Sequence, residues 1–431
     1  MGGVSMEWKE VRLGDIVSIK SGLAYKGAFI GKGENILLGM GCVSFKDKFL
    51  FSGARPYEAD CDDKYCVEPG DIVLATRQQS DNLPILAMPA IIPSSLKAKK
   101  IIYGTNLYKV ENHSEVTNDF LFWQLKTPDY IDYISSVKTG SVVRMVTKKN
   151  VEDYVFRCPP KEVRDRISKL LWGLDRKIEL NNKINADLEE MAQAIFKNWF
   201  VDFEPFKDSK FVDSELGMIP EGWKVGSYSE MIESLISGDW GKEKPQGNYT
   251  HEVACVRGCD FQDINNGVRG KTPQRYILEK NYQAKHLKDK DILVEISGGT
   301  ATVSTGRTSL VTEELLKKYK HDIVCTNFCK VLRPLSQFSS YVYYSWKYKY
   351  DNDIMFGYEN GTSGIKNFAI KDFIEKEPVL IPREQDIVEF QKIIANLQKQ
   401  KQIKGTENTT LSTLRDTLLP RLMSGELEVP E

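Results

Sequence analysis

Two strings determine the fold of this 431-residue chain: Pro69-Gly70-Asp71-Ile72-Val73-Leu74 and Asp289-Lys290-Asp291-Ile292-Leu293-Val294. Each is a variant of the other, and further pairs surround them in one order, at offsets that drift only from 215 to 222. Self-similarity at a long, nearly constant period indicates two copies of one domain. The other matching pairs are Trp8 and Trp223, Ser21-Gly22 and Ser237-Gly238, residues 105–110 and 326–331, Gly140 and Gly361, and Pro160 and Pro382.

Length and composition are those of a globular protein with two or three domains. No run of about 18 apolar residues occurs, and Glu7, Lys9 and Glu10 stand where a signal peptide needs apolar residues. We therefore expect a cytoplasmic protein. Eight cysteines are too few for a disulfide scaffold in so long a chain and fit a reducing compartment. A formal net charge of -1 argues against a nonspecific binder of polyanions, but it allows local basic patches.

Two long amphipathic helices are predicted, one after each copy of the domain. Apolar residues step mostly by three and four along residues 167–195, which is the stripe of a helix from about Lys161 to Phe200. About 40 residues of helix would span about 60 Å. A similar stripe along residues 387–422 predicts a second helix to about Met423. Residues 405–410 favour helix weakly, so a local break is allowed there.

The two apolar stripes can bury each other as an antiparallel coiled coil. Polar residues interrupt the seam, and such residues fix the register of a coiled coil at some cost in stability. They are Asn181 and Asn185 in the first helix and Lys401, Lys404 and Asn408 in the second.

The domains themselves read as short strands and loops, with a helix expected near residues 119–125. Aromatic residues of that helix could stack on nucleic-acid bases. However, aromatic character recurs at the aligned positions of the second copy, which favours packing in the core. These residues are Phe120, Phe122 and Trp123 in the first copy and Tyr341, Tyr343 and Tyr344 in the second.

Motifs for metal binding and catalysis are missing from the sequence. Cys325 and Cys329 have a ligand-like spacing, but their aligned residues in the first copy are not thiols, and structural zinc needs four clustered ligands. Pro159-Pro160 lacks the flanking residues of the Asn/Asp-Pro-Pro-aromatic string that an adenine methyltransferase needs. The glycine-rich residues 297–308 do not have the spacing of a phosphate loop. We therefore expect neither a cofactor nor a metal ion.

Three strings stand in a fixed order around the two variable domains. The first helix ends in Phe196-Lys197-Asn198-Trp199-Phe200-Val201-Asp202-Phe203-Glu204-Pro205-Phe206, and the linker reads Gly217-Met218-Ile219-Pro220-Glu221-Gly222-Trp223. The C-terminal string is Leu411-Ser412-Thr413-Leu414-Arg415-Asp416-Thr417-Leu418-Leu419-Pro420-Arg421-Leu422-Met423-Ser424-Gly425-Glu426-Leu427. Taken together in this order, they make the chain resemble the specificity subunit of type I restriction-modification enzymes.

This resemblance implies an α+β fold with two tandem homologous DNA target-recognition domains. Two long antiparallel coiled-coil helices would separate the domains, with a pseudo-two-fold axis relating the halves. The expected segments are a first recognition domain at 1–160, a central long helix at 161–204, a linker at 205–222, a second recognition domain at 223–382 and a C-terminal long helix at 383–425. The implied partners are double-stranded DNA, modification (methyltransferase) subunits and restriction (translocase/nuclease) subunits, with no membrane.

Candidate DNA contacts follow from residue type and from recurrence. Lys26 and Lys242 recur in a glycine-rich loop and suit phosphate contacts, which position a protein without reading sequence. Residues that differ between the copies are better candidates for base readout, because Arg pairs with guanine and Gln or Asn with adenine. For each, the alternative is a solvated surface residue. The base-reading candidates are Arg77, Gln78, Gln79, Asn82, Arg307 and Thr308, and the further phosphate candidates are Arg144, Lys148, Lys149 and Lys366.

An aromatic cluster at the end of the first long helix has two interpretations, both open at this point. It could dock a methyltransferase subunit, since aromatic residues are enriched at interface cores. It could equally pack internally against the second recognition domain. Its members are Phe196, Trp199, Phe200, Phe203 and Phe206.

The sequence thus predicts a non-catalytic, sequence-specific DNA-binding subunit that reads a split, asymmetric site and scaffolds its partner subunits. One alternative is a stand-alone DNA methyltransferase or nuclease. The other is a coiled-coil adaptor without DNA specificity.

Overall fold

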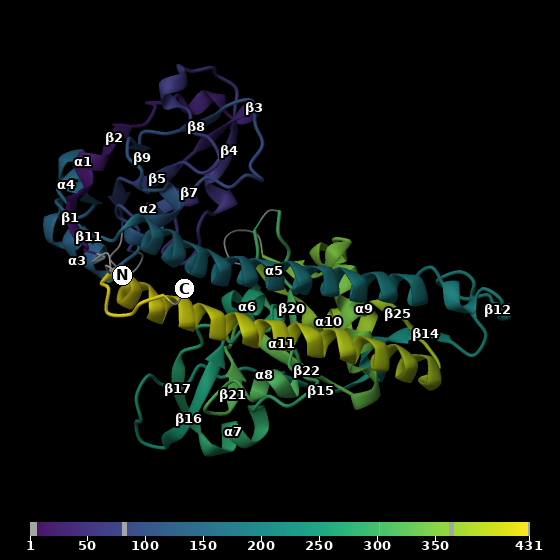
Figure 1. Cartoon of the computed structure of the whole chain (residues 1–431). Coiled ribbons are helices and arrows are strands. Elements are labelled where there is room, and N and C mark those ends of the chain that lie inside the picture. Colours follow the sequence, from purple (N-terminus) through teal and green to yellow (C-terminus); the bar gives the residue numbers. More distant parts are fainter. Residues whose placement is uncertain (1–6, 80–83, 301, 362–365, 430–431) are drawn as a thin grey trace, which may run out of the picture. The chain divides into compact units, whose positions relative to one another are not determined.

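The computed structural model describes residues 7–79, 84–300, 302–361 and 366–429. The chain divides into two compact units, unit 1 with Met1–Arg176 and Ser412–Glu431, and unit 2 with Lys177–Leu411. Each unit combines small sheets with helices, so the mixture of helices and strands predicted from the sequence is confirmed (Figure 1).

A four-stranded antiparallel sheet organises unit 1, in the order β2, β9, β5, β7. The apolar string after Pro69 forms β5 and is buried at every position, because Ile72 and Leu74 face one hydrophobic core while Val73 and Ala75 face another. A second sheet has the order β4, β3, β8, and β1 pairs with β11. The strands are β1 (Lys9–Arg12), β2 (Val17–Ser21), β3 (Ile30–Leu38), β4 (Ala54–Tyr57), β5 (Ile72–Ala75), β7 (Pro89–Ile91), β8 (Ile101–Tyr103), β9 (Leu107–Asn112) and β11 (Val155–Cys158).

Unit 2 contains sheets of the same strand order and direction. Its four-stranded sheet is β15, β22, β18, β20, its three-stranded sheet is β17, β16, β21, and β14 pairs with β25. The second apolar string forms β18 and again lies between two hydrophobic cores. The strands are β14 (Lys224–Ser227), β15 (Ile232–Ser237), β16 (Tyr249–Val256), β17 (Gln274–Leu278), β18 (Ile292–Glu295), β20 (Thr308–Leu310), β21 (Ile323–Cys325), β22 (Cys329–Pro334) and β25 (Pro378–Ile381).

Short helices cover these sheets in both units. The helix expected near residues 119–125 is present as α2, and its three aromatic residues are buried. The aligned tyrosines on α9 are also buried, so the core-packing interpretation is confirmed. The helices are α1 (Leu13–Ile16), α2 (Asn118–Gln124), α3 (Pro128–Val137) and α4 (Lys148–Glu152) in unit 1, and α6 (Phe261–Asn265), α7 (Glu279–Lys285), α8 (Glu313–Leu316), α9 (Ser339–Asp351) and α10 (Ile370–Lys376) in unit 2.

Strand register corrects one part of the sequence alignment. Leu107 pairs with the last residue of β5, and Cys329 pairs with the last residue of β18. These two residues are therefore equivalent, at an offset of 222, whereas the sequence aligned Leu107 with Phe328. The structural equivalent of Phe328 is Asn106, and both lie in the turn that precedes the strand.

Two helices of 40 residues, α5 (Lys161–Phe200) and α11 (Glu384–Met423), match the helices expected from the apolar stripes (Figure 1). α5 ends at Phe200 rather than at residue 204, because Phe203 takes a left-handed conformation with φ of 56° and Pro205 follows. The linker then forms a hairpin of β12 (Phe211–Val212) and β13 (Ile219–Pro220).

In unit 2, α5 and α11 face each other through polar residues as well as apolar ones. Asn181 Nδ2 donates to Asn408 Oδ1 at 2.9 Å, and Asn185 Nδ2 donates to the Lys401 carbonyl at 3.3 Å. Later residues of α5 thus meet earlier residues of α11, so the two segments run antiparallel. Lys404 pairs instead with a carboxylate of its own helix.

In unit 1, the beginning of α5 packs against the end of α11. Ile167 and Leu171 share a hydrophobic core with Leu419 and Leu422. Asp175 is paired with two cations of the same unit, Lys48 at 2.9 Å and Arg415 at 2.6 Å. This buried carboxylate therefore joins α5, α11 and the loop before β4.

The helix α11 continues through Gly405, so the local break allowed by the sequence is absent. A Cβ atom at Gly405 would lie 2.0 Å from the carbonyl oxygen of Gly267. Lys318 donates to the same carbonyl and to Gln402, and burial lowers the pKa of this lysine to about 8. Gly405 is therefore required by the close approach of a loop to the helix, which outweighs its weak helix propensity.

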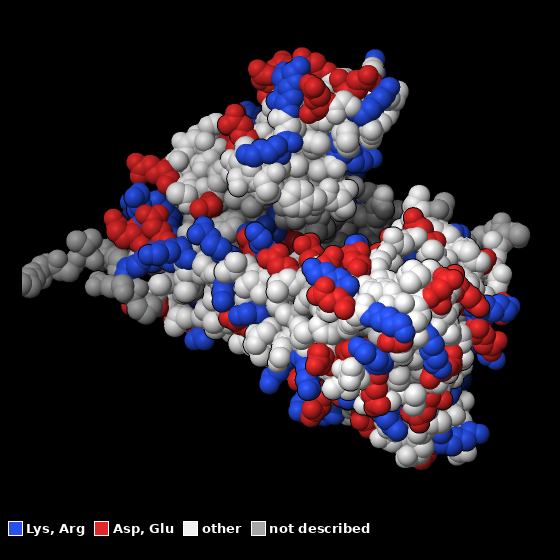
Figure 2. Space-filling view, turned by 90° about the vertical axis from the view of Figure 1, so that its right-hand side faces the viewer, with Lys and Arg blue, Asp and Glu red and all other residues white. Residues whose placement is uncertain are grey.

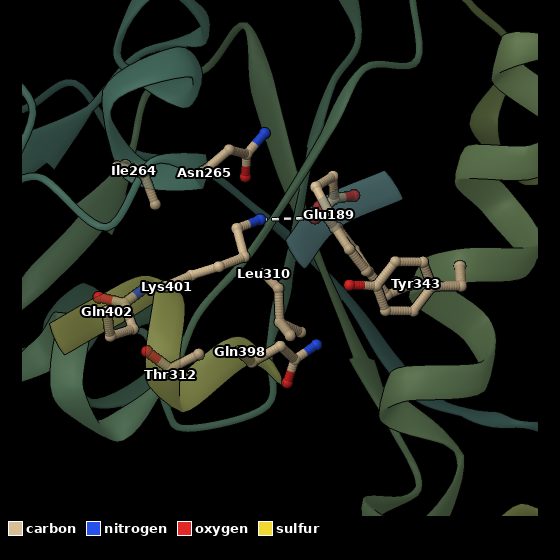
Figure 3. A pocket seen from close by; sticks show the side chains of 10 residues that line it. Glu189, Ile264, Asn265, Leu310, Thr312, Tyr343, Gln398, Lys401 and Gln402 are labelled. Carbon is tan, nitrogen blue, oxygen red and sulfur yellow. Dashed lines mark hydrogen bonds and ion pairs between the residues drawn. The ribbon is translucent and has the colours of Figure 1, made fainter. Parts of the chain in front are cut away.

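An ion pair between Lys401 and Glu189 borders a small cavity in unit 2 (Figure 3). Burial by itself would raise the pKa of Glu189, but the ammonium group of Lys401 lowers this pKa overall. The cavity measures about 20 Å³, which is enough for about one water molecule. We conclude that this pocket is part of the helix packing and is too small for a cofactor.

Candidate nucleic-acid interface

In unit 1, one end of the four-stranded sheet gathers most of the predicted DNA contacts. Ser21 pairs with Tyr108 and Ala75 pairs with Leu107, so β2 and β5 both end where β9 begins. The segments that follow β2 and β5 consequently leave the sheet at the same end. We name this end edge 1 and define it as residues 22–26, 76–79 and 105–106.

Two loops that the sequence proposed separately meet at edge 1. Residues Arg77–Gln78 form β6, which pairs with β10 (Arg144–Met145): Gln78 lies opposite Arg144, and Arg77 lies opposite Met145. Arg77 and Gln79 are exposed. The ribbon therefore presents candidate residues of both loops on one structure, while Asn82 lies outside the described residues.

Gln78 is not available to read a base, which corrects its assignment. Its side chain is buried, and its Oε1 accepts a hydrogen bond from the backbone N–H of Leu86 at 3.1 Å. Arg144 donates to the carbonyl of Gly140 at the base of its own loop. Both residues thus shape the ribbon that carries Arg77 and Gln79.

Lys148 and Lys149 are exposed on α4. This helix packs beside the middle of β2, since Glu152 accepts a hydrogen bond from the N–H of Ile19 at 2.9 Å. Strand register therefore does not place the two lysines at edge 1, and their phosphate contacts stay a prediction.

Unit 2 has an equivalent end of its four-stranded sheet. Ser237 pairs with Lys330 and Glu295 pairs with Cys329, so β15 and β18 both end where β22 begins. The segment after β18 again forms a ribbon, in which β19 (Ser297–Gly298) pairs with β24 (Lys366–Phe368), and β24 pairs with β23 (Glu359–Asn360). We name this end edge 2 and define it as residues 238–242, 295–298, 306–307 and 327–328.

The recurring lysines occupy equivalent places after β2 and β15. Lys26 and Lys242 are both exposed, and both follow a segment that leaves the sheet at its edge. The backbone N–H of Lys26 donates to Tyr57 Oη at 3.4 Å, and Lys242 Nζ lies 5.6 Å from the ring centre of Tyr249. Each lysine is thus positioned next to a tyrosine, and its phosphate contact remains a prediction.

Three candidates of unit 2 have intramolecular roles. Thr308 is buried in β20 opposite Val294, so its assignment to base readout is wrong. Lys366 forms an ion pair with Glu359 at 2.6 Å. The guanidinium of Arg307 forms two hydrogen bonds with the carboxylate of Glu295, each of 2.8 Å.

Sequence reasoning missed Glu295 and Phe328 at edge 2. Phe328 is 62% exposed although it is a large apolar residue. The one-residue error in alignment placed it on the buried Leu107, which hid its exposure. Glu295 stands where unit 1 has Ala75, and nothing in its local sequence signals that its carboxylate is buried beside an arginine.

The aromatic cluster after α5 packs internally within unit 2, which favours one of its two interpretations. Phe196, Phe200 and Phe206 are buried, whereas Trp199 and Phe203 are partly buried. The rings contact further aromatic residues of the same unit, including Trp223, Tyr341 and Phe390. Phe196, Phe200 and Phe206 are therefore core residues, not a free docking surface.

Three other features bear on the expectations from the sequence: the surface charge, possible metal sites and possible membrane spans. On the face shown in Figure 2, the described basic and acidic side chains are interspersed and form no single extended basic patch. Over the described ranges, no group of three or more His, Cys, Asp or Glu side chains is placed to bind a metal ion. Nor is any helix in this part of the chain long and apolar enough to cross a membrane.

Known proteins with similar sequences are DNA specificity subunits. Residues 6–190 match the family model of the type I restriction modification DNA specificity domain. The specificity subunit of the type I restriction enzyme MjaIX from Methanocaldococcus jannaschii is 27% identical over 333 residues, which cover 73% of this chain and 70% of the relative. The specificity subunit of HindI from Haemophilus influenzae is 24% identical over 489 residues, which cover 98% of this chain and 100% of the relative.

A solved structure shares the fold. The type I restriction-modification system S subunit from M. genitalium superimposes with a TM-score of 0.51 at 14% identity, and 98% of each chain is covered. This likeness concerns the fold, and the sequence matches identify a subunit that recognises DNA sequence. Residues 6–190 match the DNA specificity domain, and over 98% of its length the chain is similar to a type I restriction enzyme specificity subunit.

Proposed function

We propose that this specificity subunit reads a split, asymmetric DNA site, with edge 1 contacting one half-site and edge 2 the other. The supporting observation is that two sheets of the same strand order present different side chains at equivalent edges. Arg77 of β6 corresponds to Ser297 of β19, and Asn106 corresponds to Phe328. Different side chains at equivalent places favour different bases, so the two half-sites should differ.

The proposed domain organisation follows the repeat. Residues 1–160 and 223–382 are homologous recognition domains related by a pseudo-two-fold axis, and the long helices form an antiparallel coiled coil that separates the half-sites. Helices of 40 residues support this role, because each can span about 60 Å. Segments 161–204 and 383–425 then set the distance between the two recognition domains.

The subunit itself is proposed to be non-catalytic and to act in the cytoplasm. Modification subunits would supply adenine methylation, and restriction subunits would supply translocation and cleavage. The relatives support this assignment because they are specificity subunits. A stand-alone methyltransferase or nuclease is the competing function, and turnover by the purified chain with DNA and cofactor would favour it.

Sequencing of methylated DNA tests the proposal directly. Cells that carry the modification subunits are compared with and without this chain. We expect a bipartite, non-palindromic methylated motif that disappears when the chain is absent. A palindromic motif, or methylation that persists without the chain, would contradict the proposed function.

Lys26 and Lys242 are expected to contribute affinity without sequence preference. Lys26→Ala and Lys242→Ala should each weaken binding about equally for all sequences, and each should lower the slope of log affinity against log salt by about one unit. Titration of fluorescent duplex DNA at several salt concentrations measures this slope. Lys210→Ala is the matched control, because Lys210 is exposed in the linker hairpin and paired with Glu221. If both Lys26→Ala and Lys242→Ala keep the wild-type slope, the two lysines do not contact phosphates.

A further inference from the structure

At edge 2, a carboxylate holds an arginine by one side of its guanidinium. Arg307 Nε donates to Glu295 Oε2 and Nη2 donates to Oε1, each at 2.8 Å. The Glu295 side chain is 11% exposed, whereas that of Arg307 is 43% exposed. The carboxylate of Glu295 therefore lies beneath the guanidinium of Arg307, and the guanidinium is the more exposed group of the pair.

The unused donors of Arg307 are those that a guanine requires. A guanidinium carries five N–H donors, and the two bonds to Glu295 occupy only the Nε side. Among the described residues, Glu295 is the sole acceptor for this guanidinium. The outer N–H groups of Nη1 and Nη2 remain, and a paired set of this kind fits the O6 and N7 acceptors of guanine in the major groove.

The backbone beneath the pair is fixed on both sides. Glu295 N–H donates to the carbonyl of Arg307, and Gly306 N–H donates to the carbonyl of Glu295, both at 2.9 Å. Trp346, which is fully buried, donates from Nε1 to the Gly306 carbonyl at 2.9 Å. The position of the guanidinium is thus set by the core of unit 2, as precise readout of a base edge demands.

The shared sheet does not require Glu295. The equivalent residue of unit 1 is Ala75, at the end of a strand with the same pairing. In contrast, Asp291 recurs as Asp71 and is paired with Arg333 at the opposite end of β18. Asp291, which recurs, thus has the character of a structural residue. Glu295, which does not recur, has the character of a residue that is specific to one half-site.

We propose that Arg307 reads a guanine in the half-site of unit 2 and that Glu295 is its positioning residue. This inference rests on the proposed function of edge 2. Because the carboxylate neutralises the guanidinium and holds it in place, Arg307 is restrained from moving to a nearby phosphate. The pair should therefore determine base preference while contributing little to the dependence of affinity on salt.

Substitutions of Arg307 and Glu295 test this assignment. The full chain is expressed with its modification subunits on a plasmid library of randomised double-stranded targets, and methylated sites are sequenced. Arg307→Ala should reduce the preference for guanine at one position of the motif by about 10- to 100-fold. Glu295→Gln should relax the same position, because it replaces one of the two acceptor oxygens that hold Arg307 with an NH₂ group, which is a donor. Arg307→Lys, which keeps the charge but not the paired donors, should also relax it.

Asp291→Asn is the matched control, since it weakens a similar double hydrogen bond in the same sheet away from edge 2. We expect this variant to lower the thermal unfolding temperature and to leave the motif unchanged. Full guanine preference in both Glu295→Gln and Arg307→Lys would overturn the inference, as would an affected position that is not guanine. Absence of any motif with the wild-type chain would instead contradict the proposed function itself.

Discussion

Adding four residues to each long helix is expected to lengthen the unread spacer of the DNA target while both half-site sequences stay the same. The additions belong between Arg176 and Lys177 in α5 and between Leu411 and Ser412 in α11, where the two units divide. Four helical residues add about 6 Å, which corresponds to one or two base pairs at about 3.4 Å each. Sequencing of methylated DNA from cells with the lengthened chain measures the new spacer.

The site of insertion matters because polar contacts fix the helices in unit 2. Insertions next to Asn182 or Gly405 would displace the bond between Asn181 and Asn408 and the close approach of Gly267 to α11. An addition to α5 alone is the control, since it shifts one helix against the other and should abolish modification. Altered half-sites with an unchanged spacer, in the chain lengthened in both helices, would mean that the helices do not set the separation.

The long helices and the two sheets could be predicted because both produce periodic signals. An apolar stripe of some ten turns is unmistakable in sequence, and strands buried on both faces appear as the continuous apolar strings at residues 72–75 and 292–294. The continuity of α11 at Gly405 could not be predicted in the same way. It depends on the loop at Gly267, which is distant in sequence.

The register at the edges could be predicted only to within one residue. Thr105-Asn106 and Thr326-Asn327 invited a direct match, but hydrogen bonding makes Leu107 equivalent to Cys329. The Thr-Asn pair thus lies one position further from the strand in unit 2. Such a shift exchanges a buried residue for an exposed one, and for that reason Phe328 escaped notice.

The loops of the candidate interface could be predicted, but not the state of each side chain in them. The sequence proposed the loops that carry Arg77 and Arg144, and the structure brings them together in one ribbon. Gln78 and Thr308 were misassigned because strands of two or three residues are too short to show which side is buried. Glu295 was missed because its partner, Arg307, lies in the segment before β20 and not next to Glu295 in the sequence.

The aromatic residues after α5 supply the largest expected change in stability. Phe200 is 4% exposed, and its ring centre lies 4.8 Å from that of Tyr341 and 4.9 Å from that of Phe390. Phe200→Ala should lower the free energy of unfolding of unit 2 by about 3–5 kcal/mol, because it removes a buried ring and leaves a cavity. Thermal and urea unfolding of the full chain, followed by tryptophan fluorescence, measure this loss.

Phe328→Ala is the matched control for this loss, because it removes the same side chain from an exposed position of the same unit. We expect it to change the free energy of unfolding by no more than about 0.5 kcal/mol. The comparison separates the two interpretations of the aromatic cluster. If Phe200 instead served to dock a modification subunit, Phe200→Ala would leave unfolding close to that of the control and would prevent co-purification of the partner. A loss of stability in the isolated chain, with no partner present, can come only from internal packing, and in that case a docking surface must use the partly buried Trp199 and Phe203 or lie elsewhere.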